Sequence, residues 1–405
     1  MSIGNRRHLV VTLAAIALLS GNCARDAAAQ APADASKKVS PLLEPWRAKV
    51  KVTPVSPDAD RHSIHSYFNA CPESPDGRWV LYFSSTAPDA HEGELRIRER
   101  ATGKEMILAK GITTEDAHRA ACQQWISQGR RVVFHDVRDG QWVVVSVDVE
   151  TLQERVLATG RQLSWGQPHG DLVPLYGPHW DAAAFRDLEL LDVNTGERRN
   201  VFTAAAVQAA YGEWIAKEFD GQPISIFFPI LSPDLQRVIF KLASPRGGDF
   251  RSKQASHREG LIGYDLKQSK LLFQRDSWGH PAWHSDSRQI INVGIVIDSD
   301  TGASSRIAEL PHFRGSHPSF SPSGKLFTTD TLLDAFGGTE QEWGVVVAPI
   351  RGGDYHFLHR FDNSKGARSW RRSHPHPIFS ADGKRVYFNV NDSKFTQLYV
   401  AEYAN

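Results

Sequence analysis

The chain has 405 residues, and its 47 Lys and Arg residues against 46 Asp and Glu residues leave a formal net charge of +1. This balance lacks the excess of positive charge that is typical of nucleic-acid-binding and membrane-surface proteins. Because 41% of the residues are hydrophobic, the chain can bury an ordinary core, and a large all-β fold can reach this length as one domain.

Residues 1–31 have the features of an export signal. Arg6 and Arg7 form a positive start, residues 9–19 form an apolar run too short to span a bilayer, and residues 29–31 read Ala-Gln-Ala, a small-residue cleavage site. The arginine pair leaves twin-arginine export open, whereas the residues before Cys23 fit a lipidation site poorly. We therefore expect a cleaved signal, a periplasmic or secreted protein, and no membrane span.

Residues 32–51 mix Ala, Ser, Pro and Lys without a clear period, which indicates a linker or an irregular lead-in. The remaining residues, 52–405, are expected to form a single domain. Beyond the signal only Cys71 and Cys122 remain. An oxidising compartment would permit a disulfide, and the sequence leaves their pairing open.

A turn related to Ser-Pro-Asp-Gly recurs along the chain, each time before an alternating apolar stretch. Asp-Gly supplies the tight turn of a β-hairpin, and the alternation is typical of strands. The copies lie at residues 72–78, 125–130, 167–171, 231–234, 283–286, 320–325 and 379–384. Most units carry a second hairpin turn, and four strands per unit of roughly 40–60 residues match the blades of a propeller. The sequence thus predicts an all-β, seven-bladed β-propeller, with two β-sandwiches as the alternative and a helical insertion at residues 204–219.

The repeats give a common register for side chains in different units. The residue six positions before the turn Asp, or before its substitute, is His280, His317 and His376 in units five, six and seven. Inner strands surround the central channel, so we expect these imidazoles to converge at its mouth, together with His374 on the same side of its strand. Such convergence favours a divalent metal site. Since each of these histidines precedes a proline, a packing role at the strand start is the alternative.

Residues 373–382 read Ser-His-Pro-His-Pro-Ile-Phe-Ser-Ala-Asp and closely resemble the His-Pro-His-Pro segment in the last blade of oligogalacturonate lyases. The segments around His280, His257-Arg258-Glu259 and His317 are also similar, and the resemblance is best over residues 225–400. It implies a seven-bladed propeller that cleaves short pectic oligosaccharides by β-elimination with a bound metal, typically Mn²⁺.

The resemblance also implies roles for single residues. His280 matches the proposed catalytic base and Arg258 a catalytic arginine, and the implied metal ligands are His317, His374 and His376. Arg371 departs from the pattern, because the family has a metal-ligating glutamine there. An arginine has no lone pair for a metal, but it can grip a carboxylate through two hydrogen bonds. Either the metal keeps three histidines plus water, or Arg371 contacts the substrate carboxylate; both options put the pectic substrate in question.

The residues can support β-elimination on a uronate. A metal or an arginine can neutralise the carboxylate, and a neutral histidine can remove the C5 proton. His118, in the charged run at residues 115–119, is a candidate substrate contact, with a solvated loop as the alternative. We expect His62 and His65, ahead of the first unit, to lie at the surface.

Two further functions compete with this hypothesis. The first is a lyase that acts on another acidic glycan, such as ulvan or a glucuronate side chain, since fold does not settle substrate. The second is a non-catalytic module that resembles the TolB-like interaction propellers of the bacterial envelope. A peptidase is disfavoured because no Gly-x-Ser-x-Gly elbow is present. The expected partner is an acidic oligosaccharide, with no nucleic acid, and the expected state is a monomer or a simple homo-oligomer.

Overall fold

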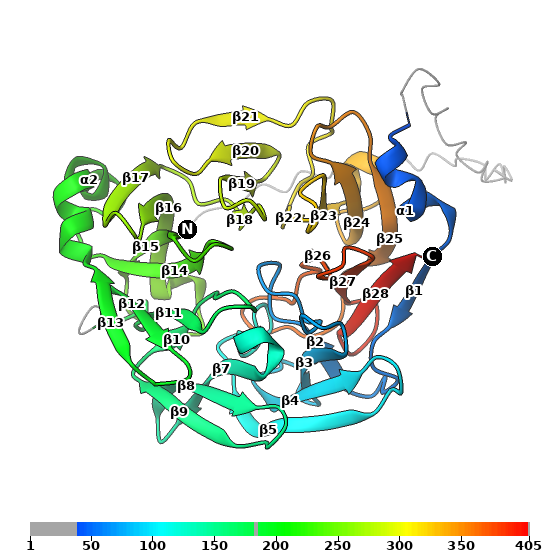
Figure 1. The fold of residues 1–405 in the computed structure, drawn as a ribbon, viewed down its shortest axis with the longest axis horizontal. Helices are drawn as coiled ribbons and strands as arrows, with labels where there is room; N and C mark the ends of the chain where they lie inside the picture. Colours follow the sequence, from blue (N-terminus) through cyan, green and yellow to red (C-terminus); the bar gives the residue numbers. More distant parts are fainter. Residues whose placement is uncertain (1–38, 182–184, 404–405) are drawn as a thin grey trace, which may run out of the picture. The chain divides into compact units, whose positions relative to one another are not determined.

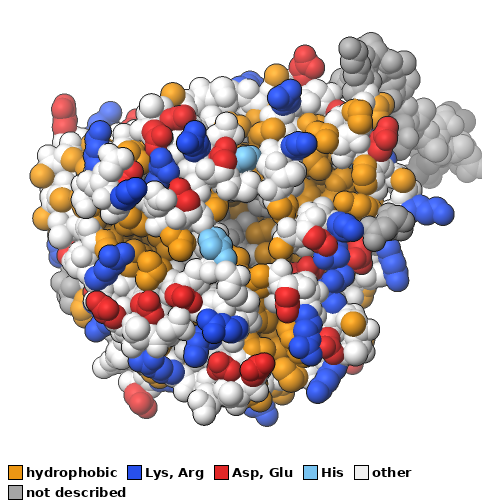
Figure 2. Space-filling model, in the orientation of Figure 1, with side chains coloured by type: hydrophobic (Ala, Val, Ile, Leu, Met, Phe, Trp, Pro, Cys, Tyr) orange, Lys and Arg blue, Asp and Glu red, His pale blue; other side chains and the backbone are white. Residues whose placement is uncertain are grey.

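A computed structural model describes residues 39–181 and 185–403, so the expected signal peptide lies outside the described residues. Seven four-stranded antiparallel sheets form a ring around a central channel (Figure 1). This arrangement confirms the predicted seven-bladed β-propeller. In Figure 2, the face seen in this view is hollowed at the centre, and histidine side chains lie near the hollow.

The strands of each blade follow one another in the sequence, except in the last blade. Blade one contains β2 (His62–Ile64), β3 (Trp79–Ser85), β4 (Glu92–Glu99) and β5 (Glu105–Thr113). Blade two contains β6 (Gln124–Ile126), β7 (Arg131–Arg138), β8 (Gln141–Asp148) and β9 (Glu154–Thr159). Blade three contains β10 (Gln162–Leu163), β11 (Leu172–Tyr176), β12 (Leu188–Asp192) and β13 (Arg198–Phe202). Blade four contains β14 (Ser225–Leu231), β15 (Arg237–Pro245), β16 (Ser256–Asp265) and β17 (Lys270–Arg275).

The second half of the ring repeats the pattern and ends on a composite blade. Blade five contains β18 (Ala282–Trp283), β19 (Gln289–Asn292), β20 (Ile295–Asp298) and β21 (Ser304–Arg306). Blade six contains β22 (Ser319–Phe320), β23 (Leu326–Leu332), β24 (Glu342–Pro349) and β25 (His356–Asp362). Blade seven contains β26 (Ile378–Phe379), β27 (Arg385–Val390), β28 (Gln397–Tyr403) and β1 (Val50–Pro54). The described helices are α1 (Glu44–Ala48), α2 (Ala204–Glu218) and the short 3₁₀ turns Pro41–Leu43, Ser127–Gly129, Lys253–Ala255 and Asp334–Phe336.

The serine of the repeated turn explains why the repeat is so regular. The Ser74 hydroxyl accepts the backbone N–H of Trp79 at 2.9 Å, five residues further on. Ser232 accepts the N–H of Arg237 in the same way at 2.9 Å. This bond occupies a donor that the tight turn would otherwise leave without a partner at the start of the second strand. The same bond recurs at Ser321 and Ser380, so the motif is a local feature that sets the hairpin of blades one, four, six and seven.

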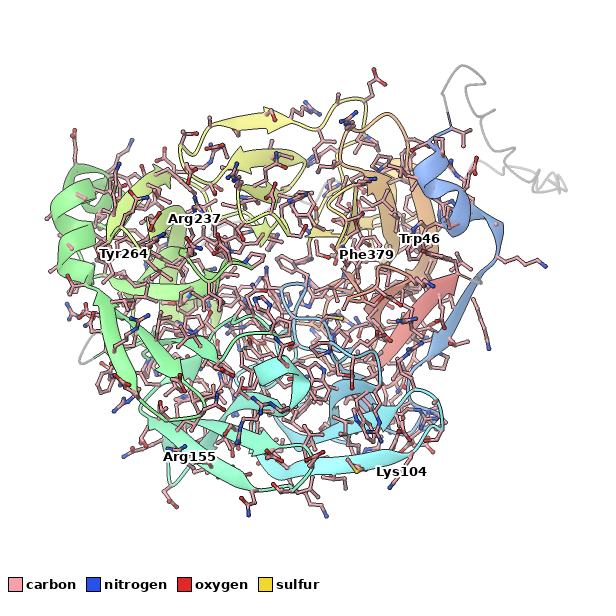
Figure 3. The ribbon with its side chains drawn as sticks, in the orientation of Figure 1. Trp46, Lys104, Arg155, Arg237, Tyr264 and Phe379 are labelled. Carbon is pink, nitrogen blue, oxygen red and sulfur yellow. The ribbon has the colours of Figure 1, made fainter. Side chains whose placement is uncertain are left out.

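The ring is closed by the N-terminal part of the described chain. Strand β1 pairs antiparallel with β28, so that Val50 lies opposite Tyr403. Helix α1 precedes β1, and its Trp46 packs edge-on against Phe379 at 5.7 Å (Figure 3). The segment predicted as an irregular lead-in thus contains helix α1 and the first two residues of β1, Val50 and Lys51.

A buried ion pair joins blade seven to the turn that precedes β3 of blade one. Arg385 on β27 donates to both carboxylate oxygens of Glu73, at 2.7 and 2.9 Å. The Tyr387 hydroxyl donates to the same carboxylate. The Glu73 side chain is only 1% exposed, so breaking this pair would leave a charge inside the protein.

Other features of the structure can be compared with the sequence analysis. Helix α2 lies between blades three and four at the outside of the ring (Figure 1), and the Thr203 hydroxyl caps it by accepting the Ala206 N–H at 3.1 Å. Cys71 and Cys122 are both free thiols. His62 and His65 are buried rather than at the surface, so that expectation was wrong.

Within the described residues, no helix has the length and apolar character needed to cross a membrane.

Candidate metal centre

Four histidines meet at the loops that precede the inner strands. His317 precedes β22, His374 and His376 precede β26, and His118 precedes β6. Each offers one ring nitrogen, and the four nitrogens lie within 4.8 Å of one another. The structure therefore brings the three predicted metal ligands into one cluster and adds His118, which the sequence analysis treated as a substrate contact.

Hydrogen bonds fix which nitrogen of two rings faces the cluster. The Nδ1–H of His317 donates to the carboxylate of Asp330 on β23, at 2.9 and 3.0 Å. The Nδ1–H of His118 donates to the carbonyl oxygen of Arg372 at 3.3 Å. With Nδ1 protonated, each ring keeps its lone pair on Nε2. A carboxylate behind a histidine is the usual way to orient a metal ligand.

The cluster contains buried nitrogens that have no partner among the described residues. They are Nε2 of His317, Nδ1 of His374 and both ring nitrogens of His376. Buried polar atoms are nearly always hydrogen-bonded, so this concentration of ring nitrogens without partners needs an explanation. A divalent metal fits it, because imidazole nitrogens are common metal ligands and the ligating form is the neutral ring.

Burial keeps these rings neutral. It lowers the pKa of His317 and of His374 to about 3, and in His374 repulsion from His317 acts in the same direction. The pKa values of His118 and His376 are also well below the ordinary value, first because of burial and then because of the neighbouring histidines. All four rings therefore present lone pairs rather than positive charge at neutral pH.

Two buried side chains hold the backbone of His376. This residue has a positive φ of 48°, a conformation that is costly for a side chain other than glycine. The Nε2–H of His65 donates to its carbonyl oxygen at 2.7 Å, and its own N–H donates to Asp330 at 3.3 Å. His65 therefore supports the cluster from behind.

His280 lies beside the cluster and outside its ligand group. Its ring centre is 4.2 Å from that of His317. Its backbone N–H donates to Asn292 Oδ1 at 2.7 Å, and Gly279 allows this approach, because a Cβ there would lie 2.2 Å from the same oxygen. Burial, then the proximity of His317 and Lys241, lowers the pKa of His280 well below its ordinary range. His280 is thus a neutral imidazole held beside the candidate metal site.

A pocket of about 540 Å³ opens over the cluster and His280. Its lining contains four histidines and four Lys or Arg residues but no Asp or Glu: His118, Lys253, His280, Gly315, His317, Arg368, Trp370, Arg371, Arg372 and His374. In a chain with a net charge of +1, this is a local excess of positive charge. The pocket is therefore suited to an anionic ligand.

Arg371 lines this pocket, and Arg258 lies near the pocket residue Trp370. Both guanidinium groups lie near the ring of Trp370, at 5.7 and 4.4 Å from its centre. Burial lowers the pKa of both; repulsion from Arg371 helps to bring that of Arg258 to about 10, and repulsion from Arg119 adds to the lowering in Arg371. Neither side chain makes a hydrogen bond or an ion pair to the described residues. Two neighbouring, partly buried cations without a partner are costly unless an anion binds to them.

The loop at residues 115–119 is an ordered, buried element rather than a solvated loop. Arg119 pairs with Glu115 at 2.9 Å. Asp116 Oδ1 accepts the backbone N–H groups of His118 and Arg119, at 3.0 and 2.9 Å. These contacts hold His118 at the cluster. Sequence reasoning missed a ligand role for His118 because this residue does not lie six positions before the turn residue of its blade. Its place ahead of an inner strand is the only sequence signal for such a role.

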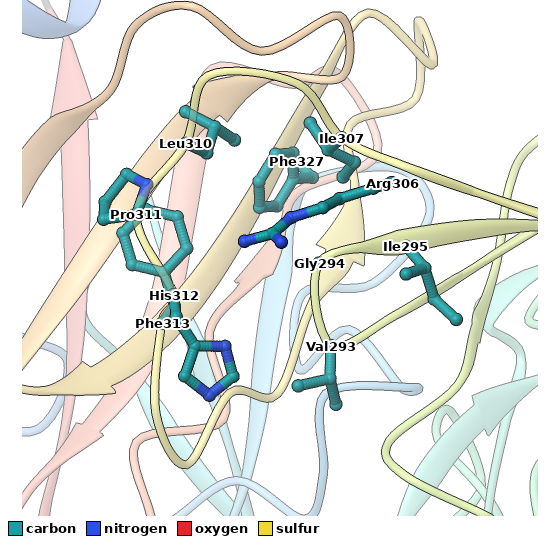
Figure 4. A pocket seen from close by; sticks show the side chains of 10 residues that line it. All are labelled: Val293, Gly294, Ile295, Arg306, Ile307, Leu310, Pro311, His312, Phe313 and Phe327. Carbon is teal, nitrogen blue, oxygen red and sulfur yellow. The ribbon is translucent and has the colours of Figure 1, made fainter.

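A second pocket, of about 230 Å³, lies between blades five and six (Figure 4). Phe313, Phe327 and Leu310 contribute an apolar lining, and Arg306 reaches across it. It shares no lining residue with the histidine pocket and contains none of the four clustered histidines. We therefore place the candidate active site at the histidine pocket.

The fold and this site define the class: a seven-bladed propeller with a buried histidine cluster beneath a basic pocket. No protein-family model matches the chain, and neither does any curated protein. Among solved structures, it is similar to an oligogalacturonate lyase in complex with manganese, with 17% identity, a TM-score of 0.61, and coverage of 87% of this chain and 93% of that chain.

An oligogalacturonate lyase from Vibrio parahaemolyticus gives 17% identity, a TM-score of 0.60, and coverage of 88% and 94%. A prolyl endopeptidase gives 10% identity, a TM-score of 0.50, and coverage of 84% and 51%. At such low identity these likenesses establish the propeller fold, and the function has to be argued from the site.

Proposed function

We propose that this protein is a lyase that cleaves uronate-containing oligosaccharides by β-elimination. The observation that carries the proposal is the position of His280, a neutral buried imidazole between a candidate metal site and a basic pocket that has no acidic lining. Two of the similar solved structures, each covering most of both chains, are oligogalacturonate lyases, which supports this assignment.

Arg371 and Arg258 would bind the substrate carboxylate. An arginine can form two parallel hydrogen bonds with a carboxylate, which fixes the orientation of the sugar as well as its charge. A bound carboxylate would also offset the cost of keeping these two cations buried without a partner. Neutralising the carboxylate makes the C5 proton more acidic, because negative charge develops next to it in the transition state.

His280 would then act as the general base. Its neutral ring takes the C5 proton, and the C5–H electrons form the C4=C5 double bond. The bond between C4 and the glycosidic oxygen breaks, and that oxygen leaves with a proton supplied by water. A divalent metal, when bound, supplies further positive charge beside the carboxylate. His317, His374 and His376 would hold it, with His118 at the same cluster, and manganese is the reference because the similar lyase contains it.

A lyase for a different acidic glycan is the second candidate, and Arg371 favours it. A guanidinium that lines the pocket adds a carboxylate-binding group to the histidine cluster, so it changes which sugar acid fits. Ulvan oligosaccharides and glucuronate side chains are therefore substrates to test beside oligogalacturonates.

We further propose that the protein acts after export, in the periplasm or outside the cell.

The test is the ultraviolet absorbance of the conjugated, unsaturated uronate that β-elimination creates. Purified protein is incubated with each oligosaccharide, with and without a chelator. We expect a chelator-sensitive rise on at least one substrate, and a loss of about 10²–10⁴-fold in turnover for His280→Ala at unchanged metal content. His312→Ala, in the other pocket, is the matched control and should retain full activity. No rise on any substrate from folded, metal-loaded protein would instead favour a non-catalytic, TolB-like interaction propeller.

A further inference from the structure

We infer that His118 is the fourth ligand of this site, and that the resulting set of four imidazoles takes zinc in preference to manganese. The inference deepens the proposed function, since it concerns the metal of the same site, but it does not depend on lyase activity. It also departs from the manganese that the similar lyase contains.

His118 is as close to the cluster as the other three histidines are to one another. Its ring centre lies 4.4 Å from that of His376, 4.7 Å from that of His374 and 5.9 Å from that of His317. Nitrogens bound tetrahedrally to zinc at about 2.0–2.1 Å are roughly 3.4 Å apart. The present spacing, within 4.8 Å, therefore needs only small ring movements to close around an ion.

The loop presents His118 in the ligating tautomer. The Arg372 carbonyl holds its Nδ1–H, so the Nε2 lone pair is available. Asp116 and the pair between Arg119 and Glu115 keep the loop in place before any ion binds. A ligand that is already ordered loses little conformational entropy on binding, so His118 should contribute strongly to affinity.

No carboxylate belongs to the ligand group found among the described residues. Asp330, which contacts the cluster, accepts from His317 and from backbone N–H groups, and Oδ1 of Asp116 accepts the N–H groups of His118 and Arg119. Imidazole ligands suit zinc, copper, iron and nickel, whereas manganese is better served by carboxylate, carbonyl and water oxygens. Manganese also lies at the weak end of the affinity order for divalent first-row metals. The donor set thus favours zinc.

The experiment uses the full chain without substrate. The protein is stripped with a chelator and dialysed against equal concentrations of zinc and manganese, and the bound metal is quantified by mass spectrometry. Zinc affinity is then measured by competition with a chromophoric chelator. We expect one zinc per chain and at least about 100-fold selectivity over manganese. Cobalt substituted into the site should show the strong visible absorption of a tetrahedral ion.

Two variants test His118 itself. His118→Ala should weaken zinc binding by more than about 100-fold, that is, by more than the loss of an outer hydrogen-bond partner usually costs. His118→Gln offers an amide oxygen in place of the imidazole nitrogen, so it should reduce the selectivity for zinc over manganese. His312→Ala is the control, and circular dichroism and thermal melts verify that each variant folds.

Equal loading with manganese, or a His118→Ala protein that binds zinc within about twofold of the parent, would overturn the inference. The proposed lyase activity is scored separately, by product absorbance. A protein that binds zinc as expected but cleaves nothing refutes the proposed function alone. A protein that cleaves its substrate but prefers manganese refutes this inference alone.

Discussion

The carboxylate of Asp330 connects three parts of the candidate metal centre, so replacing it with asparagine is an informative perturbation. Its oxygens accept the Nδ1–H of His317 at 2.9 and 3.0 Å, the backbone N–H of His317 at 2.7 Å and that of His376 at 3.3 Å. Asp330 is fully buried. Asp330→Asn preserves the size of the side chain but turns one of these acceptor oxygens into an NH₂ donor.

Two separate losses follow from this geometry. His317 loses the carboxylate that orients its ring, and losses of this kind typically weaken metal binding by about 10–100-fold, or about 1.4–2.7 kcal/mol. The new NH₂ group must also face an N–H donor, either that of His317 or that of His376. A buried donor left without its acceptor costs about 1–3 kcal/mol, and this cost should appear in the stability of the metal-free protein.

Competition with a chromophoric chelator measures the first loss, and denaturant unfolding of the metal-free protein measures the second. Asp300→Asn is the matched control, because Asp300 lies in the exposed turn between β20 and β21 and pairs with Arg237 rather than with a residue of the cluster. Metal affinity within about twofold of the parent, in a folded Asp330→Asn protein, would refute the view that Asp330 orients a metal ligand.

Three further outcomes are expected. Arg371→Gln should lower kcat/KM on the uronate substrate by about 10–100-fold at unchanged metal content, because it removes a charge-assisted contact worth about 1.5–3 kcal/mol. Steady-state kinetics and metal analysis measure both quantities, and an unchanged kcat/KM would contradict a role for Arg371 in binding the substrate. Burial lowers the pKa of His62 to about 4 and of His135 to about 3, so the unfolded chain takes up protons first as the pH falls below the ordinary 6.5. The free energy of unfolding should therefore be fully present above about pH 6.5 and fall towards pH 4, and denaturant midpoints that stay constant over this range would contradict the assignment. Glu73→Gln should lower the free energy of unfolding by about 1.5–3 kcal/mol, because it removes a charge-assisted partner of Arg385, which keeps Asp382 and Glu402. A thermal melt close to that of the parent would show that the seam between blades one and seven tolerates its loss.

The fold was predictable because four of the blades repeat the same hydrogen bond within their first turn. The hydroxyl of Ser74 or Ser232 binds a backbone N–H five residues away, so the turn is encoded within a few residues and can be recognised without knowledge of the rest. The helix at residues 204–218 was predictable for the same reason, since its cap is Thr203. The role of β1 was not, because its partner β28 lies at the other end of the described chain.

The residues of the candidate site also fall into two groups, those that the repeat predicts and those that it does not. His280, His317 and His376 share a repeat register, so their convergence could be predicted before the structure was known. His118 has no such register, and Asp330 reaches His317 across a hairpin. His65 was misplaced because a short strand next to the channel is covered by loops that sequence periodicity does not describe. Register thus predicts which side chains meet, but not the partners that orient them.

The pairing of β1 with β28 also constrains how the protein can fold. Val50 lies opposite Tyr403, so the last blade is complete only when the two ends of the described chain meet. Contacts between such distant residues form slowly, because the entropy of closing so long a loop must be lost before any contact energy is gained. Until that step, β28 exposes an open edge to other chains. Ring closure should therefore be the slow phase of folding, and the one most sensitive to protein concentration.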